Sequence, residues 1–269
     1  MTTATFAGSI PQTYHTFLGP LIFDAYARDL ATRLKSLAKA NARVLEIACG
    51  TGIVTKELLA SLPAGGSFIA SDLSEPMLTL GRANVVADAR LTFQQADACA
   101  LPFKDKSFDL IACQFGVMFF PDKVKAMQES RRVLTPGGTY LFSIWDSLAA
   151  NPIPRVEHET IAALFPKDPP QFLAKFPYGY SDRAEIDRVT RAGGFANVKI
   201  ETAQFPCTAP AAEDAARGFV EGTPILPALQ ERGVTDIAPV RAAVTKALAE
   251  KFGDRPCRST MSAIVVTAS

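Results

Sequence analysis

The chain has 269 residues, of which 48% are hydrophobic, so it can bury one large core or a core with a small second domain. Its 28 basic and 27 acidic side chains leave a net charge of +1, which argues against a nucleic-acid partner. The five cysteines form no C-x-x-C pair and only two histidines are present, so neither a disulfide framework nor a zinc site is expected.

The N-terminal segment, residues 1–11, lacks the charged start and apolar core of a signal peptide. No apolar run in the chain is long enough to span a bilayer. We therefore expect a cytoplasmic protein without a membrane span, either as a monomer or as a homodimer.

Strands and helices are predicted to alternate through the first 145 residues. Residues 1–12 carry no periodicity and are expected to form a loose arm, whereas 17–38 has apolar residues at helical spacing. The predicted strands are 43–48, 67–71, 91–95, 108–114 and 139–145, and the predicted helices are 51–62, a helix starting at Ser74, and 122–134. Such alternation predicts an α/β fold with a mainly parallel sheet and helices on both faces.

The later chain has a different character. Residues 151–180 are rich in proline and aromatic side chains, and they are followed by a predicted helix at 181–192, a strand at 197–205, a helical stretch at 209–253 and a strand at 259–267. The expected organisation is an N-terminal arm and helix covering the cofactor (1–40), a cofactor-binding core (41–150), a proline- and aromatic-rich insert (151–180) and the end of the sheet (181–269). Residues of about 206–253 are expected to form a helical substrate cover within that last part.

The first predicted strand ends in Gly50-Thr51-Gly52, a turn in which glycine lets a ligand approach the backbone. A dinucleotide site requires a third glycine, but Thr55 stands at that position. Glu46 adds a negative charge that would repel a pyrophosphate and favour a cationic amino group or a sulfonium. These features favour S-adenosylmethionine over NAD, although a tight turn without a ligand would explain the glycines alone.

Two further acids follow predicted strands. Asp72 ends the second strand, twenty residues after Gly52, where a carboxylate can accept both hydroxyl protons of a ribose. The alternative is an exposed turn acid or a helix N-cap. Asp97 follows the third strand and can accept the exocyclic amine of adenine, while Ala98 supplies a backbone N–H.

Apolar residues near these acids are predicted to pack on the purine: Leu73, Met77 and Leu101. Ordinary core packing is the alternative for Met77 and Leu101. The segment from Gln114 to Phe120 follows the fourth strand and is expected to separate the cofactor from the substrate. Core packing is equally compatible with Phe119 and Phe120.

Five motifs follow one another along the chain: Glu46-x-Ala48-x-Gly50-x-Gly52, Asp72-Leu73-Ser74, Asp97-Ala98-x-x-Leu101-Pro102-Phe103, Phe108-Asp109 and the segment from Arg131 to Gly138. Together they closely resemble the motifs of class I S-adenosylmethionine-dependent methyltransferases, with the ubiquinone/menaquinone-biosynthesis C-methyltransferases as the nearest branch. The resemblance covers about 42–145 and is looser beyond.

The resemblance implies a Rossmann-like sheet of seven strands with the last strand antiparallel. It also implies a cofactor site in which each part of S-adenosylmethionine has its own residues. Glu46, Ala48, Gly50 and Gly52 would surround the methionine moiety, Asp72 the ribose, Asp97 and Ala98 the adenine, and Gln114 with Phe115 the inner rim.

The expected activity is in-line methyl transfer to a small, partly hydrophobic or aromatic acceptor, with S-adenosylhomocysteine as product. Such a reaction needs alignment and exclusion of water more than an acid–base pair. Tyr14 is a candidate for the cofactor's amino acid end, and His15 and His158 are candidate bases or substrate contacts. A surface histidine beside a packed tyrosine is the alternative. No carboxylate cluster suits magnesium, so no metal is expected.

Two other functions remain open. A binding or regulatory protein would keep the cofactor contacts without turnover. An NAD-dependent dehydrogenase would need the third glycine that Thr55 replaces, together with a proton relay.

Overall fold

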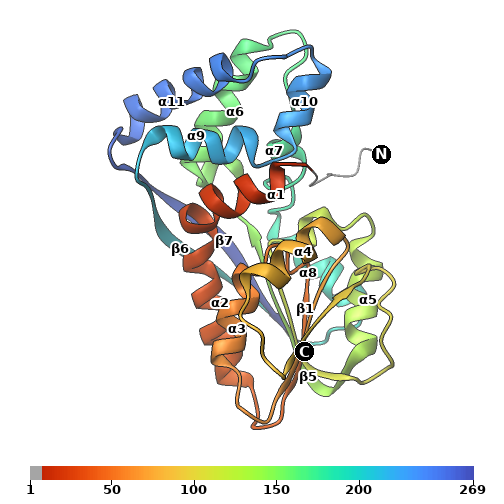
Figure 1. Cartoon of the computed structure of the whole chain (residues 1–269). Helices are drawn as coiled ribbons and strands as arrows, with labels where there is room; N and C mark the ends of the chain where they lie inside the picture. The colour runs from red at the N-terminus through yellow and green to blue at the C-terminus, as the bar shows by residue number, and fades with distance from the viewer. Residues whose placement is uncertain (1–7) are drawn as a thin grey trace. The chain divides into compact units, whose positions relative to one another are not determined.

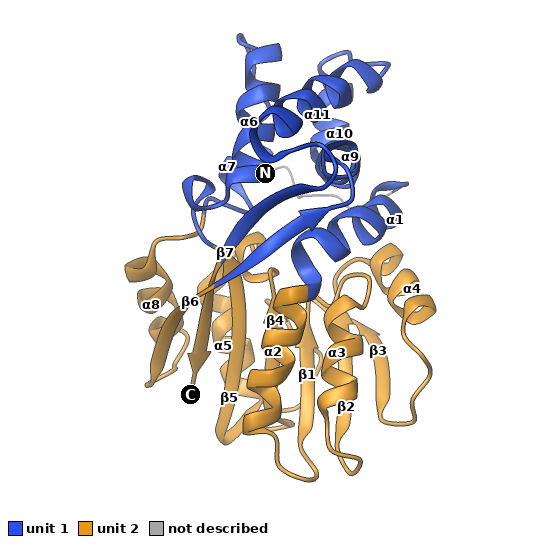
Figure 2. Ribbon diagram, turned by 90° about the vertical axis from the view of Figure 1, so that its left-hand side faces the viewer, with its two compact units in different colours: residues 1–24, 146–179, 204–262 blue, residues 25–145, 180–203, 263–269 orange. Residues whose placement is uncertain are grey.

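The computed structural model describes residues 8–269, which form two compact units whose segments alternate along the chain (Figure 2). Unit 1 contains residues up to 24, 146–179 and 204–262. Unit 2 contains residues 25–145, 180–203 and 263–269.

The sheet has seven strands in the order β3-β2-β1-β4-β5-β7-β6. The strands are β1 (Arg43–Ile47), β2 (Ser67–Asp72), β3 (Leu91–Gln95), β4 (Phe108–Gln114), β5 (Leu134–Trp145), β6 (Val198–Ala209) and β7 (Cys257–Ala268). The pairs from β3 to β5 are all parallel, whereas β7 pairs antiparallel with β5. The predicted seven-stranded, mainly parallel sheet with an antiparallel last strand is confirmed.

Helices cover both faces of the sheet in unit 2, with α2 and α3 on one face and α5 and α8 on the other (Figure 1). The helices of unit 2 are α2 (Asp24–Leu37), α3 (Ile53–Ser61), α4 (Glu75–Asn84), α5 (Lys123–Val133) and α8 (Arg183–Ala192). A short 3₁₀ turn, Val117–Phe119, follows β4. Strands β1 and β4 are almost wholly buried because helices lie on both sides of them.

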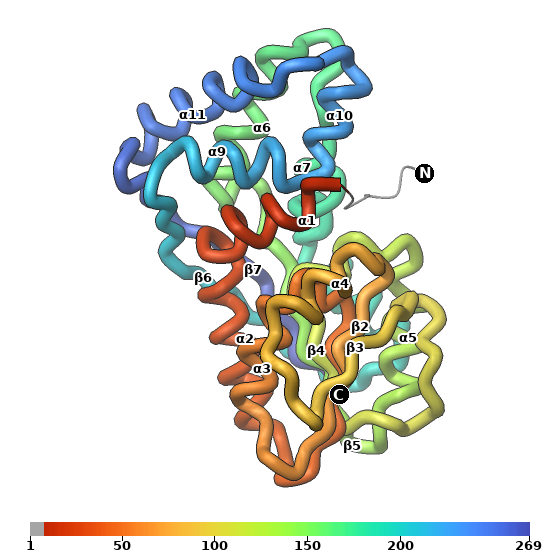
Figure 3. Tube along the Cα trace, viewed as in Figure 1, coloured from red at the N-terminus to blue at the C-terminus, as the bar shows by residue number. Residues whose placement is uncertain are grey.

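Unit 1 is largely helical (Figure 3). Its elements are α1 (Ile10–Thr13), a π-helical stretch (Tyr14–Phe23), a 3₁₀ turn (Leu148–Ala150), α6 (Pro152–Leu164), α7 (Phe172–Lys175), α9 (Ala212–Glu221), α10 (Ile225–Glu231) and α11 (Ala238–Phe252). Helix α11 packs against α9 and α6, and the π-helical stretch packs against α9. Gly218 of α9 allows α9 and the π-helical stretch to pack closely, because a Cβ at this position would lie 2.9 Å from Leu18 Cδ2.

Two element predictions were wrong. Residues 10–12 were expected in the loose arm but belong to helix, because Ile10 and Pro11 are buried against other residues of the protein; residues 1–7 of that arm lie outside the described residues. The insert, for which the sequence predicted no particular element, contains α6, whose first turn accommodates Pro152 and Pro154 because proline needs no N–H there. Strand β5 begins at Leu134, earlier than predicted, with a register shift in its pairing to β4.

Within the part of the chain that the structure describes, no helix has both the length and the apolar character required to cross a bilayer.

Candidate cofactor site

The loop after β1 has a left-handed backbone at three positions. The φ angles are +57° at Ala48, +56° at Gly50 and +84° at Gly52, and only Ala48 lacks the freedom of glycine. The Cys49 amide donates to Ser71 O at 2.9 Å, so the loop stays tied to β2 before α3 begins. Strained backbone at the carboxyl end of a strand is typical of ligand sites.

The two glycines of the loop are needed for different reasons. A Cβ on Gly50 would meet nothing within 4 Å, so this side of the loop is open. A Cβ on Gly52 would lie 2.7 Å from Val85 Cγ2 and 3.3 Å from Gly81 Cα. Gly52 therefore allows the loop to pack against α4, whereas the sequence interpretation assigned both glycines to ligand approach.

Asp72, at the end of β2, is held by two backbone amides. Its Oδ2 accepts from Gly50 N at 2.8 Å and its Oδ1 accepts from Ser74 N at 2.8 Å. Burial raises the pKa of Asp72 above its ordinary value, and these hydrogen bonds oppose the shift. Each oxygen retains accepting capacity for a further donor, so the carboxylate is fixed in place between the loop after β1 and the start of α4.

Glu46 is 1% exposed and its Oε2 accepts from the Thr55 hydroxyl at 2.7 Å. Burial, together with a smaller effect of the Asp72 charge, raises the pKa of Glu46 to about 8, although the Thr55 hydrogen bond opposes the shift. Glu46 therefore carries a proton near neutral pH until a cation approaches it. Sequence reasoning noted Thr55 only as a missing glycine, although a hydroxyl one turn into the following helix is well placed to face back toward β1.

The end of β4 lies directly beside the loop after β1. Phe115 has φ +56°, its amide donates to Ser143 O at 2.8 Å, and its ring stacks on Trp145 with centroids 3.7 Å apart. A Cβ on Gly116 would lie 2.5 Å from Ala48 Cβ, so only glycine permits this close approach. Gln114, the last residue of β4, is 8% exposed, and its role and that of Phe115 at the rim of the site stay predictions.

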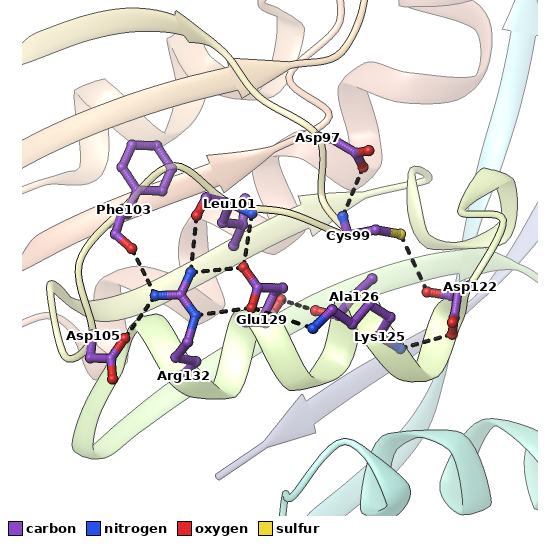
Figure 4. A network of polar contacts seen from close by, with 11 residues as sticks. Asp97, Cys99, Leu101, Phe103, Asp105, Asp122, Lys125, Ala126, Glu129 and Arg132 are labelled. Carbon is purple, nitrogen blue, oxygen red and sulfur yellow. Dashed lines mark hydrogen bonds and ion pairs between the residues drawn. The ribbon is translucent and has the colours of Figure 1, made fainter.

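The loop after β3 carries Asp97 and Ala98 (Figure 4). Asp97 Oδ1 accepts from Cys99 N at 2.8 Å, and Asp97 O accepts from Ala100 N at 3.0 Å. Ala98 is buried, and so is Leu101. The loop is therefore compact, with the Asp97 carboxylate at its start.

The three apolar candidates differ in exposure. Leu73 is 64% exposed, whereas Met77 and Leu101 are buried. The exposure of Leu73 fits a surface that a ligand covers. The burial of Met77 and Leu101 agrees with their alternative as core, and their packing on a purine stays a prediction.

The remaining candidates belong to unit 1. Tyr14 stacks on Phe23 with ring centroids 4.7 Å apart, His15 follows it in the same π-helical stretch, and burial lowers the pKa of His158 in α6. Their roles stay predictions. Among residues 8–269, no group of three or more His, Cys, Asp or Glu side chains is arranged to hold a metal ion.

Comparisons with known proteins identify the family. A family model described as a methyltransferase domain matches residues 45–142. Demethylmenaquinone methyltransferase from Lactiplantibacillus plantarum is 37% identical over 155 residues, which cover 56% of this chain and 63% of that relative. The protein of the same name from Clavibacter sepedonicus is 32% identical over 172 residues, which cover 60% of this chain and 68% of the relative. The chain belongs to the class I S-adenosylmethionine-dependent methyltransferases.

This methyltransferase also resembles solved members in fold. Phosphoethanolamine N-methyltransferase 2 from Haemonchus contortus, in complex with phosphomonomethylethanolamine and S-adenosylhomocysteine, superposes with a TM-score of 0.61 at 17% identity. The superposition covers 96% of this chain and 56% of that one. The resemblance drawn from the sequence motifs is confirmed.

The site residues of this methyltransferase fit S-adenosylmethionine, the family's cofactor. Asp72 is fixed with accepting capacity to spare, Gly50 has an open side, and Leu73 is exposed next to them. The family match includes all of these residues, because it spans 45–142.

Proposed function

We propose that this methyltransferase transfers the methyl group of S-adenosylmethionine to a small, partly hydrophobic or aromatic acceptor. The observation that carries the proposal is the Asp72 carboxylate, fixed by the amides of Gly50 and Ser74 at the carboxyl end of β2. A carboxylate held in this way is preorganised to accept the two ribose hydroxyls without paying for reorientation.

Each part of the cofactor is assigned to different residues of unit 2. Asp72 would accept from the ribose, Asp97 with the Ala98 amide would bind the adenine edge, and Glu46 would face the ammonium of the methionine moiety. Glu46 would lose its proton as that ammonium binds, because a nearby cation favours the carboxylate. Gln114 and Phe115 would form the rim between this moiety and the acceptor.

S-adenosylmethionine, when bound, supplies a methyl group that is already electrophilic. The protein therefore has to hold the acceptor atom in line with the methyl carbon and to exclude water. Where the acceptor atom bears a proton, His15 is the proposed base and Tyr14 a proposed contact to the cofactor's amino acid end. We assign acceptor selection to residues 151–180 and 206–253, which lie outside the 45–142 family match.

The names of the relatives suggest an acceptor class. Both bacterial relatives are named demethylmenaquinone methyltransferases, and they share 32–37% identity with this chain over the aligned residues. We propose a quinol-like aromatic ring as the acceptor, methylated at carbon. An electron-rich ring carbon can attack the methyl group as its bond to sulfur breaks, and the ring then loses a proton.

The test combines a measurement of cofactor binding with an assay of methyl transfer. Calorimetry with S-adenosylhomocysteine should show one site, and methyl-labelled S-adenosylmethionine should transfer label to a demethylated quinol in a panel with phenols, amines, protein and RNA. Label found only in protein or RNA would reject a small-molecule acceptor. Binding of the cofactor with no transfer to any acceptor would instead support a regulatory protein, and no binding would reject the proposal.

A further inference from the structure

Helix α5 carries an ion pair that contacts the loop after β3 (Figure 4). Arg132 Nε donates to Glu129 Oε1 at 2.9 Å and Arg132 Nη2 donates to Glu129 Oε2 at 2.7 Å. This is the two-point geometry that fixes both groups relative to each other. The Arg132 hydrogen bonds hold the pKa of Glu129 below its ordinary value, so the pair stays ionised at neutral pH.

The pair binds the main chain of the loop at three atoms. Leu101 N donates to Glu129 Oε2 at 2.9 Å, and Arg132 Nη2 donates to Leu101 O at 2.9 Å. Arg132 Nη1 donates to Phe103 O at 2.8 Å and to Asp105 Oδ1 at 2.8 Å. The two ends of this loop segment are thus held by one guanidinium.

The loop has few hydrogen bonds of its own. Besides the contacts of Glu129 and Arg132, Asp97 accepts from the amides of Cys99 and Ala100, and Lys104 O accepts from the Ser107 hydroxyl at 2.7 Å. The Cys99 thiol also donates to Asp122 O at 3.4 Å, at the start of α5. Ala96 N donates to Asp72 O at 3.0 Å, so the pairing with β2 extends to the residue before Asp97. From Cys99 onward, the loop is held by contacts with α5 and with Asp122, the residue before it.

Stability alone explains such a pair poorly. Glu129 is 9% exposed but the Arg132 side chain is 31% exposed, and an ion pair that is open to solvent contributes little to stability. What the pair does supply is a fixed path for the main chain between Leu101 and Asp105. A path fixed in this way holds the preceding residues, Asp97 and Ala98, in place for a ligand.

We propose that Glu129 and Arg132 are positioning residues for the nucleobase end of the cofactor, fixing the loop from Asp97 to Asp105 so that adenine is preferred over other bases. This inference rests on the proposed cofactor site. Neither side chain touches the ligand; both act through the loop.

The experiment compares two ligands on the intact protein by calorimetry. S-adenosylhomocysteine carries the exocyclic amine, and S-inosylhomocysteine has a carbonyl oxygen in its place. We expect the wild-type chain to prefer the first by about tenfold, the value of one good hydrogen bond to a charged group. Arg132→Lys keeps the charge but loses the two-point geometry, and we expect the preference to fall to about threefold or less.

Arg90→Lys is the matched control. Arg90 pairs with Asp88 at 2.7 Å and donates to the main-chain oxygens of Leu59, Leu62 and Pro63, but it precedes β3 whereas the loop follows it. This variant should lower the unfolding temperature and leave the ligand preference unchanged. Equal loss of preference in both variants would mean a general loss of stability and would overturn the inference.

Further outcomes separate the two proposals. A wild-type chain that binds neither ligand contradicts the proposed cofactor site itself. Binding of S-adenosylhomocysteine with an unchanged preference in Arg132→Lys overturns only the positioning role. If Arg132→Lys does not fold, Glu129→Gln serves as the second variant, with faster hydrogen exchange at the Leu101 amide as the expected result. Unchanged exchange and preference in Glu129→Gln would overturn the inference.

Discussion

Buried carboxyl groups have hydrogen-bond partners in unit 2, whereas the buried carboxyl group of Glu157 in unit 1 has none among residues 8–269. In unit 2, Asp72 accepts from two backbone amides and Glu46 accepts from the Thr55 hydroxyl. In unit 1, Glu157 of α6 is fully buried, and neither of its carboxyl oxygens has a hydrogen-bond partner among residues 8–269. The difference is that hydrogen-bond donors of the protein fix the acids of unit 2, whereas Glu157 is kept in an apolar interior at a cost to folding.

The surroundings of Glu157 follow from its place in the helix. Ile153 and Ile161, one turn before and one turn after it, are also buried, so all three share the inward face of α6. This helix packs against α11, whose buried residues are Val240, Val244 and Leu248. Burial raises the pKa of Glu157 well above its ordinary value, which favours the protonated form in the folded state.

The largest expected effect tests the held acid of unit 2. Asp72→Ala removes the acceptor for the ribose hydroxyls and frees the amides of Gly50 and Ser74. We expect the dissociation constant of S-adenosylhomocysteine to rise by about 100-fold, as two hydrogen bonds to a charged group are lost. Calorimetry measures the change.

Asp109→Ala is the control for this variant. Asp109 also accepts from a backbone amide, Arg43 N at 2.9 Å, but at the beginning of β1 and β4. The Asp109→Ala variant should have a lower free energy of unfolding and an unchanged affinity for S-adenosylhomocysteine. An unchanged affinity in Asp72→Ala would show that the fixed carboxylate does not bind the ligand.

The next effect tests the unpartnered acid of unit 1. Glu157→Leu should raise the free energy of unfolding at pH 8 by about 2 kcal/mol, because it replaces a buried carboxyl with an apolar group. Since the folded pKa lies above the unfolded one, the stability of the wild-type chain should fall as pH rises above the ordinary range of glutamate. The advantage of the variant should therefore shrink toward acid pH.

Urea unfolding at several pH values measures this difference. Glu159→Leu, two residues away on the exposed side of α6, is the control and should show no comparable pH-dependent gain. If the wild-type chain and Glu157→Leu have parallel stability profiles from pH 5 to 8, Glu157 does not carry its proton into the folded state.

The smallest effect concerns proton release at Glu46. In the free protein burial raises the pKa of Glu46 to about 8, and a bound ammonium should lower it, so binding should release a proton below that pH. Affinity for S-adenosylhomocysteine should then rise with pH, by at most about tenfold per unit, and level off above the pKa of the free protein. Calorimetry in buffers of different ionisation enthalpy counts the proton.

Glu46→Gln should abolish the pH dependence of binding while the Thr55 hydroxyl keeps an oxygen to donate to. Proton release that persists in this variant would assign the linkage to another group. A flat profile in the wild-type chain would show that Glu46 does not face the ammonium.

Local sequence patterns accounted for most of unit 2. Short, mostly apolar runs such as Val44–Ile47, interrupted only by Glu46, and Leu110–Cys113 predict buried parallel strands, and the glycines and acids near their ends predict the cofactor site. They were less informative in unit 1, where the composition of the insert at 151–180 predicted no element although Pro152 and Pro154 lie in the first turn of α6. Proline predicts the end of a helix at most positions but is accepted in its first turn, so its meaning depends on where the helix begins.

By itself, the sequence determined the order of the strands' motifs and therefore the family and its cofactor. Those features are local, since each motif lies at the end of one strand. Only the tertiary structure decided why Gly52 and Gly116 must be glycines, that Thr55 binds Glu46, and that Arg132 holds the loop after β3. These relations join residues from different elements, and a contact between two elements is set by how they pack, which periodicity along one chain segment does not encode.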